Sequence, residues 1–189
     1  MRVVAGKCRS LPLKAVPGKG TRPTTDRIKE TLFNIIQSAI PDAMVLDLFA
    51  GSGALGIEAL SRGAAFAWFV DSDRKAVEIV QQNLAFTKLT PDADVLHMQA
   101  VDAIRILSGK GLHLDIVFLD PPYGRDLEKE ALIEFHKASC TDKDTLFIVE
   151  AAIDTSFSWL EEEGYSCIKE KQYKTNKHLF IKQSSGEKL

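Results

Sequence analysis

The sequence of 189 residues lacks the features that mark secreted, metal-binding and membrane proteins. Its three cysteines, Cys8, Cys140 and Cys167, are odd in number and scattered, so they predict neither a disulfide framework nor a zinc site. The four histidines show no metal-ligand spacing. No apolar run approaches the roughly 18 residues of a membrane span, and the first residues lack the apolar core of a signal peptide. These absences favour a metal-free domain in a reducing cytoplasm, and we take a monomer as the default oligomeric state.

The net charge is close to zero, at −2, but the charge is unevenly distributed. Residues 1–30 carry eight Lys or Arg against two acids, giving +6, and residues 165–189 carry six Lys against two acids, giving +4. The residues between these ends must therefore carry −12. Basic segments are commonly solvated surface, and the functional alternative is a face that binds a polyanion.

Apolar periodicity predicts a chain in which strands and helices alternate. Strands are expected at 44–49, 65–70, 93–99, 115–119, 145–150, 165–173 and 177–183, and helices at 24–40, 53–63, 74–87, 103–108, 129–139 and 157–164. Such alternation is typical of an α/β fold with a mostly parallel sheet and helices on both faces. The last two strands are close enough in sequence to form a hairpin, which makes the last strand antiparallel. We expect a small N-terminal β-hairpin arm at 1–24, the main domain at 25–183 and a tail at 184–189.

The segment LDLFAGSGALG places Gly51, Gly53 and Gly56 between an expected strand and an expected helix. This is the spacing of a dinucleotide fingerprint, and Asp71 ends the next strand about 20 residues later, where an acid can bind a ribose diol. NAD and S-adenosylmethionine both need that acid, so the pattern leaves both cofactors open. Asp47 has no standard role in the dinucleotide fingerprint, and it could orient the loop or hold the cofactor's amino group. A tight turn without a ligand is the structural alternative.

The stretch DIVFLDPPYGRD ends an apolar strand in an acid, two prolines and a tyrosine. Prolines fix φ and lack an N–H, so the Asp120 carboxylate and the Pro121 carbonyl become two rigid acceptors, which suit an exocyclic amine. Their charge stabilises the positive charge that develops on an attacking nitrogen. Tyr123 offers a ring on which a planar base can stack, and this role makes its hydroxyl dispensable. If this strand is the fourth, Asp120 lies beside the glycine loop. A surface Pro-Pro turn is the alternative.

Together with these motifs, RPTTDRIKETLFN and the opening MRVVAGKCR make the chain resemble the bacterial 16S ribosomal RNA guanine-N2 methyltransferases of the RsmD type over nearly its whole length. The resemblance implies a class I methyltransferase (Rossmann-like) fold with seven strands and S-adenosylmethionine as the cofactor. It implies methylation of one guanine of 16S rRNA in the small ribosomal subunit or a late assembly intermediate. The expected catalytic residues are Asp120, Pro121, Pro122 and Tyr123; the cofactor-binding residues Asp47, Phe49, Ala50, Gly51, Gly53, Asp71, Ser72, Asp102, Ala103 and Asp120; and the RNA-binding residues Arg2, Lys7, Arg9, Arg22, Thr24 and Arg27.

The chain departs from the family pattern at three positions. Asp71 stands where the family usually has Glu, and Ser10 and Lys174 stand where it usually has glycines. The same residues leave three other functions open: an amino-methyltransferase for DNA adenine, DNA cytosine or tRNA, an NAD-dependent dehydrogenase, and an RNA-binding protein without activity. The chain has no room for a separate target-recognition domain, shows no dehydrogenase pair, and keeps the residues from Asp120 to Tyr123 intact. We also expect removal of residues 1–20 to abolish RNA methylation and to spare cofactor binding.

Overall fold

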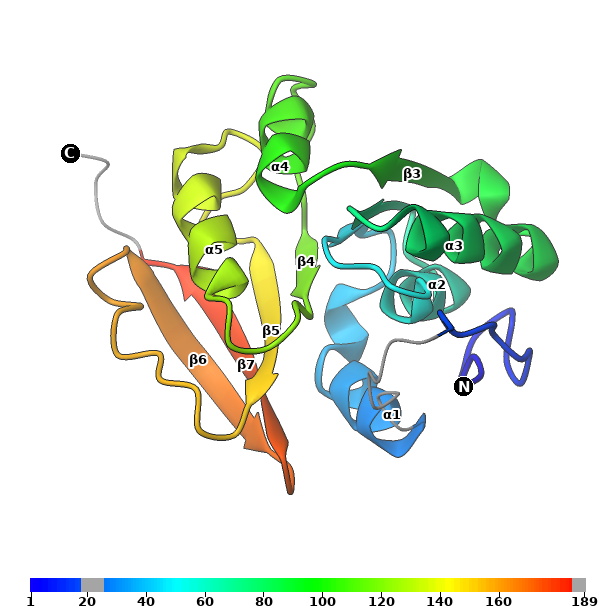
Figure 1. The fold of residues 1–189 in the computed structure, drawn as a ribbon, viewed down its shortest axis with the longest axis horizontal. Coiled ribbons are helices and arrows are strands. Elements are labelled where there is room, and N and C mark those ends of the chain that lie inside the picture. Colours follow the sequence, from blue (N-terminus) through cyan, green and yellow to red (C-terminus); the bar gives the residue numbers. More distant parts are fainter. Residues whose placement is uncertain (18–25, 185–189) are drawn as a thin grey trace.

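The computed structural model describes residues 1–17 and 26–184 (Figure 1). Seven strands in these residues form one sheet in the order β3-β2-β1-β4-β5-β7-β6, and the helices pack against it. The strands are β1 (Met44–Asp47), β2 (Phe66–Asp71), β3 (Ala93–His97), β4 (Ile116–Leu119), β5 (Leu146–Ala152), β6 (Tyr165–Gln172) and β7 (Asn176–Gln183). The helices are α1 (Asp26–Ile35), α2 (Ala54–Ser61), α3 (Arg74–Thr87), α4 (Ala100–Ser108) and α5 (Leu127–Lys137), with short 3-10 helices η1 (Gln37–Ala39) and η2 (Thr90–Asp92). The first five strands pair in parallel, and β7 is antiparallel to both β5 and β6, as the sequence predicted.

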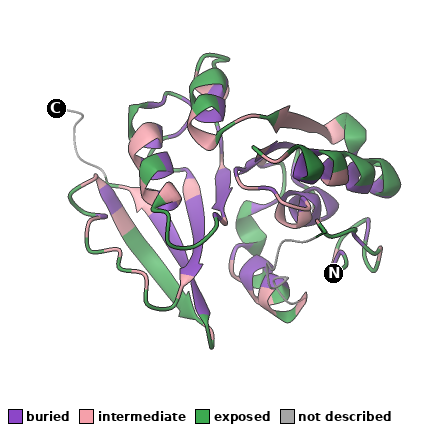
Figure 2. Ribbon diagram, in the orientation of Figure 1, coloured by how far each residue is buried: buried purple, intermediate pink, exposed green. Residues whose placement is uncertain are grey.

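Helices cover both faces of the sheet, and the central strands are buried between them (Figure 2). Successive side chains of a strand point to opposite faces. In β4, Phe118 therefore packs with Phe33 of α1 and residues of α2 and α3, whereas Val117 packs with Phe135 of α5 and residues of α4. This burial on both sides explains why the inner strands are continuous apolar runs rather than alternating ones.

The order of the strands reverses at β1, which pairs with β2 on one side and with β4 on the other. The prediction that the fourth strand neighbours the first is confirmed. Parallel strands end at one edge of a sheet, so the loops after β1, β2, β4 and β5 meet at the carboxyl edge. Ligands of open α/β sheets bind at such a reversal point.

The described part of the N-terminal arm, residues 1–17, is a hairpin-like segment held by one antiparallel bridge between Arg2 and Pro12. It is built into the main core, because Val3 and Leu13 are buried with residues of α1, α2 and α3. The fully buried carboxylate of Glu58 in α2 accepts the N–H groups of Val4 and Ala5 at 2.7 and 2.9 Å. Removing the arm would open the core and leave this carboxylate without those donors.

The sequence pattern is wrong at residues 157–164, which form turns and no helix. Local hydrogen bonds replace a helical ladder there: the hydroxyl of Ser156 accepts the N–H of Ser158 at 3.4 Å, and its carbonyl accepts the indole N–H of Trp159 at 3.2 Å. Serines compete with helices in this way, and a run of eight residues is too short to offset the cost of helix nucleation. In the described ranges, no helix combines the length and apolarity that crossing a bilayer requires.

Candidate active site

The glycine loop, residues 48–53, connects β1 to α2 at the carboxyl edge. Gly51 and Gly53 have φ values of +54° and +77°, in the left-handed region that side chains disfavour. A side chain added at Gly51 would meet no atom within 4 Å, so the loop is open on that side. Gly56 serves packing instead, because a Cβ there would come within 2.3 Å of the ring of Phe69 in β2. Two glycines therefore shape an open loop, and the third lets α2 approach the sheet.

Two acids hold this loop. The buried Asp47 at the end of β1 accepts the N–H of Gly56 at 3.0 Å, which joins the strand to the first turn of α2 just after the loop. Its burial raises the pKa of Asp47 to about 7, against the effect of the Gly56 N–H and with a further rise from the charge of Asp71. Asp71, at the end of β2, accepts the N–H of Gly51 at 2.9 Å and that of Asp73 at 2.8 Å. The glycine loop is thus clamped between the ends of two strands.

The DPPY loop, residues 120–126, follows β4. Burial raises the pKa of Asp120 well above the usual range, and the nearby charges of Glu150 and Asp47 raise it further. Among the described residues, no donor is hydrogen-bonded to the Asp120 carboxylate. Pro121 is buried, whereas Pro122 is exposed, and the ring of Tyr123 is 49% exposed. An acceptor and an accessible aromatic ring therefore stand next to each other beside the glycine loop.

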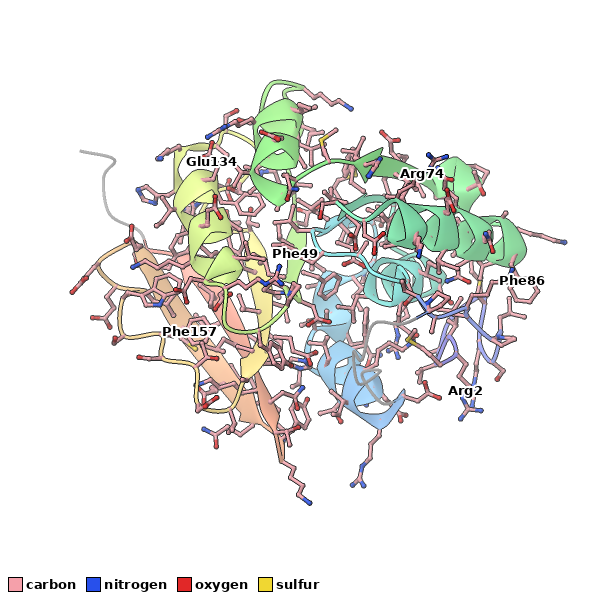
Figure 3. The ribbon with its side chains drawn as sticks, viewed as in Figure 1. Arg2, Phe49, Arg74, Phe86, Glu134 and Phe157 are labelled. Carbon is pink, nitrogen blue, oxygen red and sulfur yellow. The ribbon has the colours of Figure 1, made fainter. Side chains whose placement is uncertain are left out.

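The other predicted cofactor residues lie on the same edge but differ in accessibility. Phe49 is half-buried where the glycine loop passes β4, near the middle of the view in Figure 3. Ala50 and Ala103 are buried, and Ser72 is exposed after β2. Asp102 lies in the first turn of α4 with its side chain 60% exposed, 3.9 Å from the guanidinium of Arg105. Helix α4 begins after Gln99, so Asp102 is not its cap.

Sequence reasoning missed three buried polar residues beside the DPPY loop. Glu150 of β5 accepts hydrogen bonds from the hydroxyl of Tyr123 at 3.0 Å and the side-chain amide of Asn176 at 2.7 Å. Its other oxygen lies 3.0 Å from Nε2 of His178. Burial opposes ionisation, but the bonds from His178, Asn176 and Tyr123 outweigh it and lower the pKa of Glu150. The available signal was a glutamate inside the apolar run LFIVEAA.

The predicted RNA-binding residues lie on the N-terminal arm and on α1. Arg2 forms an ion pair with Asp26 at 3.1 Å, and Lys7 forms one with Asp92 at 3.2 Å; all four side chains are more than one-third exposed. Arg9 and Arg27 are exposed, and Arg22 and Thr24 lie outside the described residues. Ser10, which replaces a family glycine, has a φ of +70°, so this departure puts a side chain into the left-handed region.

The position of β7 decides between the two cofactor folds that the glycine pattern left open. Dinucleotide-binding sheets run in the order 3-2-1-4-5-6, whereas here an antiparallel strand separates β5 from β6. With a glycine loop after β1 and an acidic Pro-Pro loop after β4, this arrangement defines a class I methyltransferase. In the part of the chain that the structure describes, His, Cys, Asp and Glu form no group of three that could hold a metal ion.

Comparison with known proteins narrows the class to a family. The family model described as "Conserved hypothetical protein 95" matches residues 1–182. The ribosomal RNA small subunit methyltransferase D of Escherichia coli is 40% identical over 154 residues, which cover 82% of this chain and 76% of that protein. The enzyme of the same name from Haemophilus influenzae is 34% identical over 172 residues, covering 90% and 88%. The solved structure of the Escherichia coli protein yhhF superposes with a TM-score of 0.81 at 34% identity, covering 98% of this chain and 99% of that one. The chain belongs to the ribosomal RNA small subunit methyltransferase D family.

Proposed function

We propose that the protein transfers a methyl group from S-adenosylmethionine to the exocyclic N2 of a guanine in 16S rRNA. The observation that carries this proposal is the Asp120 carboxylate, which stands at the reversal point of the sheet without a hydrogen-bond donor from the described residues. It is fixed between β4 and a buried proline, with the Tyr123 ring two residues further along the exposed loop. Family membership supports ribosomal RNA as the substrate class.

The charges of the site fit a cationic cofactor. The interacting carboxylates of Asp47, Asp71 and Asp120 converge on the glycine loop. A pyrophosphate there would face these negative charges, whereas S-adenosylmethionine, when bound, supplies an electrophilic methyl group on a positively charged sulfur. We assign the ribose to Asp71 and the adenine amino group to Asp102. The remaining contacts would come from Asp47, Phe49, Ala50, Gly51, Gly53, Ser72, Ala103 and Asp120.

The residues of the DPPY loop explain how an unreactive aryl amine is activated. The carboxylate of Asp120 and the carbonyl of Pro121 accept the two N–H groups of the amine, which localises the nitrogen lone pair. Pro121 and Pro122 keep these acceptors in place, and the ring of Tyr123 stacks against the base. A cationic cofactor beside Asp120 favours its ionised form against the effect of burial, and this negative carboxylate stabilises the positive charge that develops on the nitrogen. The proton leaves after the transfer, when the nitrogen is acidic, so the site needs no strong base.

The guanine must leave its stack to reach the carboxyl edge, and the surrounding RNA backbone must be held meanwhile. We assign this task to the N-terminal arm, residues 1–24, with Arg9 and Arg27 as exposed phosphate contacts. Arg2 and Lys7 can join them, because surface ion pairs such as theirs contribute only about 0–1 kcal/mol and exchange readily with phosphate. As the form of the RNA substrate we propose the small subunit or a late assembly intermediate. We further propose that the enzyme acts on it as a monomer.

The test is the transfer of labelled methyl groups from S-adenosylmethionine to four acceptors: small subunits, naked 16S rRNA, tRNA and DNA. We expect label in small subunits and N2-methylguanosine after digestion to nucleosides. Label in tRNA or DNA alone, or on adenine or cytosine, would contradict the proposal and favour the amino-methyltransferase for another nucleic acid.

A further inference from the structure

The side chain of Glu150 is the feature of the site that the chemistry described above does not use. It is 8% exposed within a strand whose other residues are apolar, and burying an ionised carboxylate costs several kcal/mol unless hydrogen bonds replace the lost water. The strand needs no charge for its pairing, because β5 bonds to β4 and β7 through its backbone. A carboxylate kept at such a cost calls for a specific partner.

The carboxylate is held rigidly from one side. Glu150 stands opposite His178 in the antiparallel pair of β5 and β7, and Asn176 precedes it by two residues on the same strand. Because the carboxylate oxygen accepts, Nε2 of His178 is the donor, and Nδ1 of the same ring lies 3.4 Å from the hydroxyl of Tyr173. Both β7 residues are buried, so their side chains have little freedom. The direction of the Glu150 carboxylate is therefore set by the sheet.

From the other side, Glu150 receives the hydroxyl of Tyr123 at 3.0 Å. Tyr123 lies on a loop with its ring half exposed, and such a side chain would otherwise move among several rotamers. The register of β4 and β5 pairs Leu119 with Val149, so Asp120 and Glu150 follow side by side. The hydrogen bond thus ties the ring to a fixed point next to the acceptor of the target amine.

We propose that Glu150 is a positioning residue for methyl transfer, which holds the Tyr123 ring beside Asp120 through the tyrosyl hydroxyl. This inference rests on the proposed function and deepens it. It replaces the expectation that the hydroxyl is dispensable. Correct placement of a reacting group within a site is worth large factors in rate, and a ring that swings away cannot hold the base in line. The alternative is that Glu150 only joins β5 to β7, in which case the Tyr123 hydroxyl does not matter to the reaction.

The two roles separate in a double-mutant cycle of Tyr123→Phe and Glu150→Leu, measured as kcat and KM with small subunits. Tyr123→Phe leaves the buried bonds of Glu150 intact, so it does not threaten folding. We expect it to lower kcat about fivefold, the factor that one lost hydrogen bond of about 1 kcal/mol gives, while KM for S-adenosylmethionine stays unchanged. Glu150→Leu, which has no acceptor, should cost at least as much, and the double variant no more than Glu150→Leu, because both changes break the same contact.

Tyr165→Phe is the matched control, because its buried hydroxyl donates to the carbonyl of Leu132 at 2.7 Å on α5, outside the site. It should lower thermal stability and leave kcat unchanged. Full kcat for Tyr123→Phe, or independent effects that multiply in the double variant, would overturn the positioning role.

The hydrogen bond between Tyr123 and Glu150 can also be tested by NMR, without a measurement of enzymatic activity. The chain has three tyrosines, so the ring carbon next to each hydroxyl can be followed by NMR with labelled tyrosine. In Glu150→Leu the Tyr123 signal should move toward the value of a solvated phenol, and the Tyr165 signal should stay. An unmoved Tyr123 signal would overturn the tether. If the parent methylates no nucleic acid but this signal moves, the proposed function fails while the tether stands.

Discussion

Replacing Asp47 by Asn should remove a pH dependence of stability that the buried carboxylate builds into the fold. Burial raises the pKa of Asp47 from 3.8 to about 7, so between these values the folded protein binds a proton that the unfolded chain has lost. Stability therefore falls as the pH rises through this window, and the loss is complete above about pH 7. Asn has the same shape, and its carbonyl can still accept the N–H of Gly56.

The size of the effect follows from the pKa values. Each pKa unit is worth about 1.4 kcal/mol, so the full rise corresponds to about 4 kcal/mol, of which about 2.5 kcal/mol falls between pH 5 and pH 8. The assay is urea unfolding of the parent and of Asp47→Asn across that range. The stability of the variant relative to the parent should increase by about 2.5 kcal/mol from pH 5 to pH 8.

Asp115→Asn is a matched control, because the Asp115 carboxylate accepts the N–H of Met44 at 2.8 Å with its side chain 45% exposed. A constant difference between the parent and Asp47→Asn at every pH would refute the reasoning. A second arm adds S-adenosylmethionine. A cation near Asp47 favours its charged form, so the cofactor should stabilise the parent more at pH 8 than at pH 5.

The remaining predictions concern the acceptor, the RNA surface and the arm. Asp120→Asn should lower turnover by at least about 100-fold and raise the Kd for S-adenosylmethionine by no more than about tenfold in calorimetry, because the carboxylate contributes to cofactor binding but mainly serves the target amine; equal losses in both would contradict that role. Arg9→Glu should weaken RNA binding and lower its salt-dependence slope by about 1, measured by filter binding. Glu58→Ala should destabilise the fold by about 3–5 kcal/mol in urea, because it leaves the buried ammonium of Lys29 without the carboxylate 3.1 Å away. Ser10→Gly should raise the melting temperature. Glycine relieves the left-handed strain of the folded state, and this gain exceeds the cost of the extra conformational freedom in the unfolded chain, for a net stabilisation of up to about 1 kcal/mol.

The Glu58 contacts also change how the arm is tested. Deleting residues 1–20 was expected to separate RNA methylation from cofactor binding. The structure shows that residues 1–17 contribute to the core and donate two N–H groups to Glu58. A deletion would unfold the domain and affect both properties, so single charge reversals at exposed arginines are the sharper experiment.

Local signals in the sequence were sufficient where the structure depends on neighbours along the chain. The helix predicted at 74–87 from apolar periodicity has the same ends in the structure, where Asp73 caps its start and Lys88 closes it in the left-handed conformation. The two loops of the site were found for the same reason, since each motif lies directly after its strand. The adjacency of β1 and β4 followed from counting strands.

Long-range pairing is what the sequence did not reveal. Glu150 meets His178 only because β7 inserts between β5 and β6, and it meets Tyr123 only because the loop after β4 folds toward β5. Nothing near Glu150 in sequence indicates these partners. The sequence of the arm likewise gave no sign that Val3 packs in the same core as Phe33, because burial there depends on where the hairpin docks.

The most direct test of the account is nucleoside analysis of small subunits incubated with S-adenosylmethionine and either the parent protein or Asp120→Asn. We predict that the parent forms one N2-methylguanosine per subunit and that the variant methylates at less than about one-hundredth of the parent's rate. Methylation at another base or atom, or an undiminished rate with Asp120→Asn, would contradict the claim that the DPPY loop presents a guanine amine for methyl transfer.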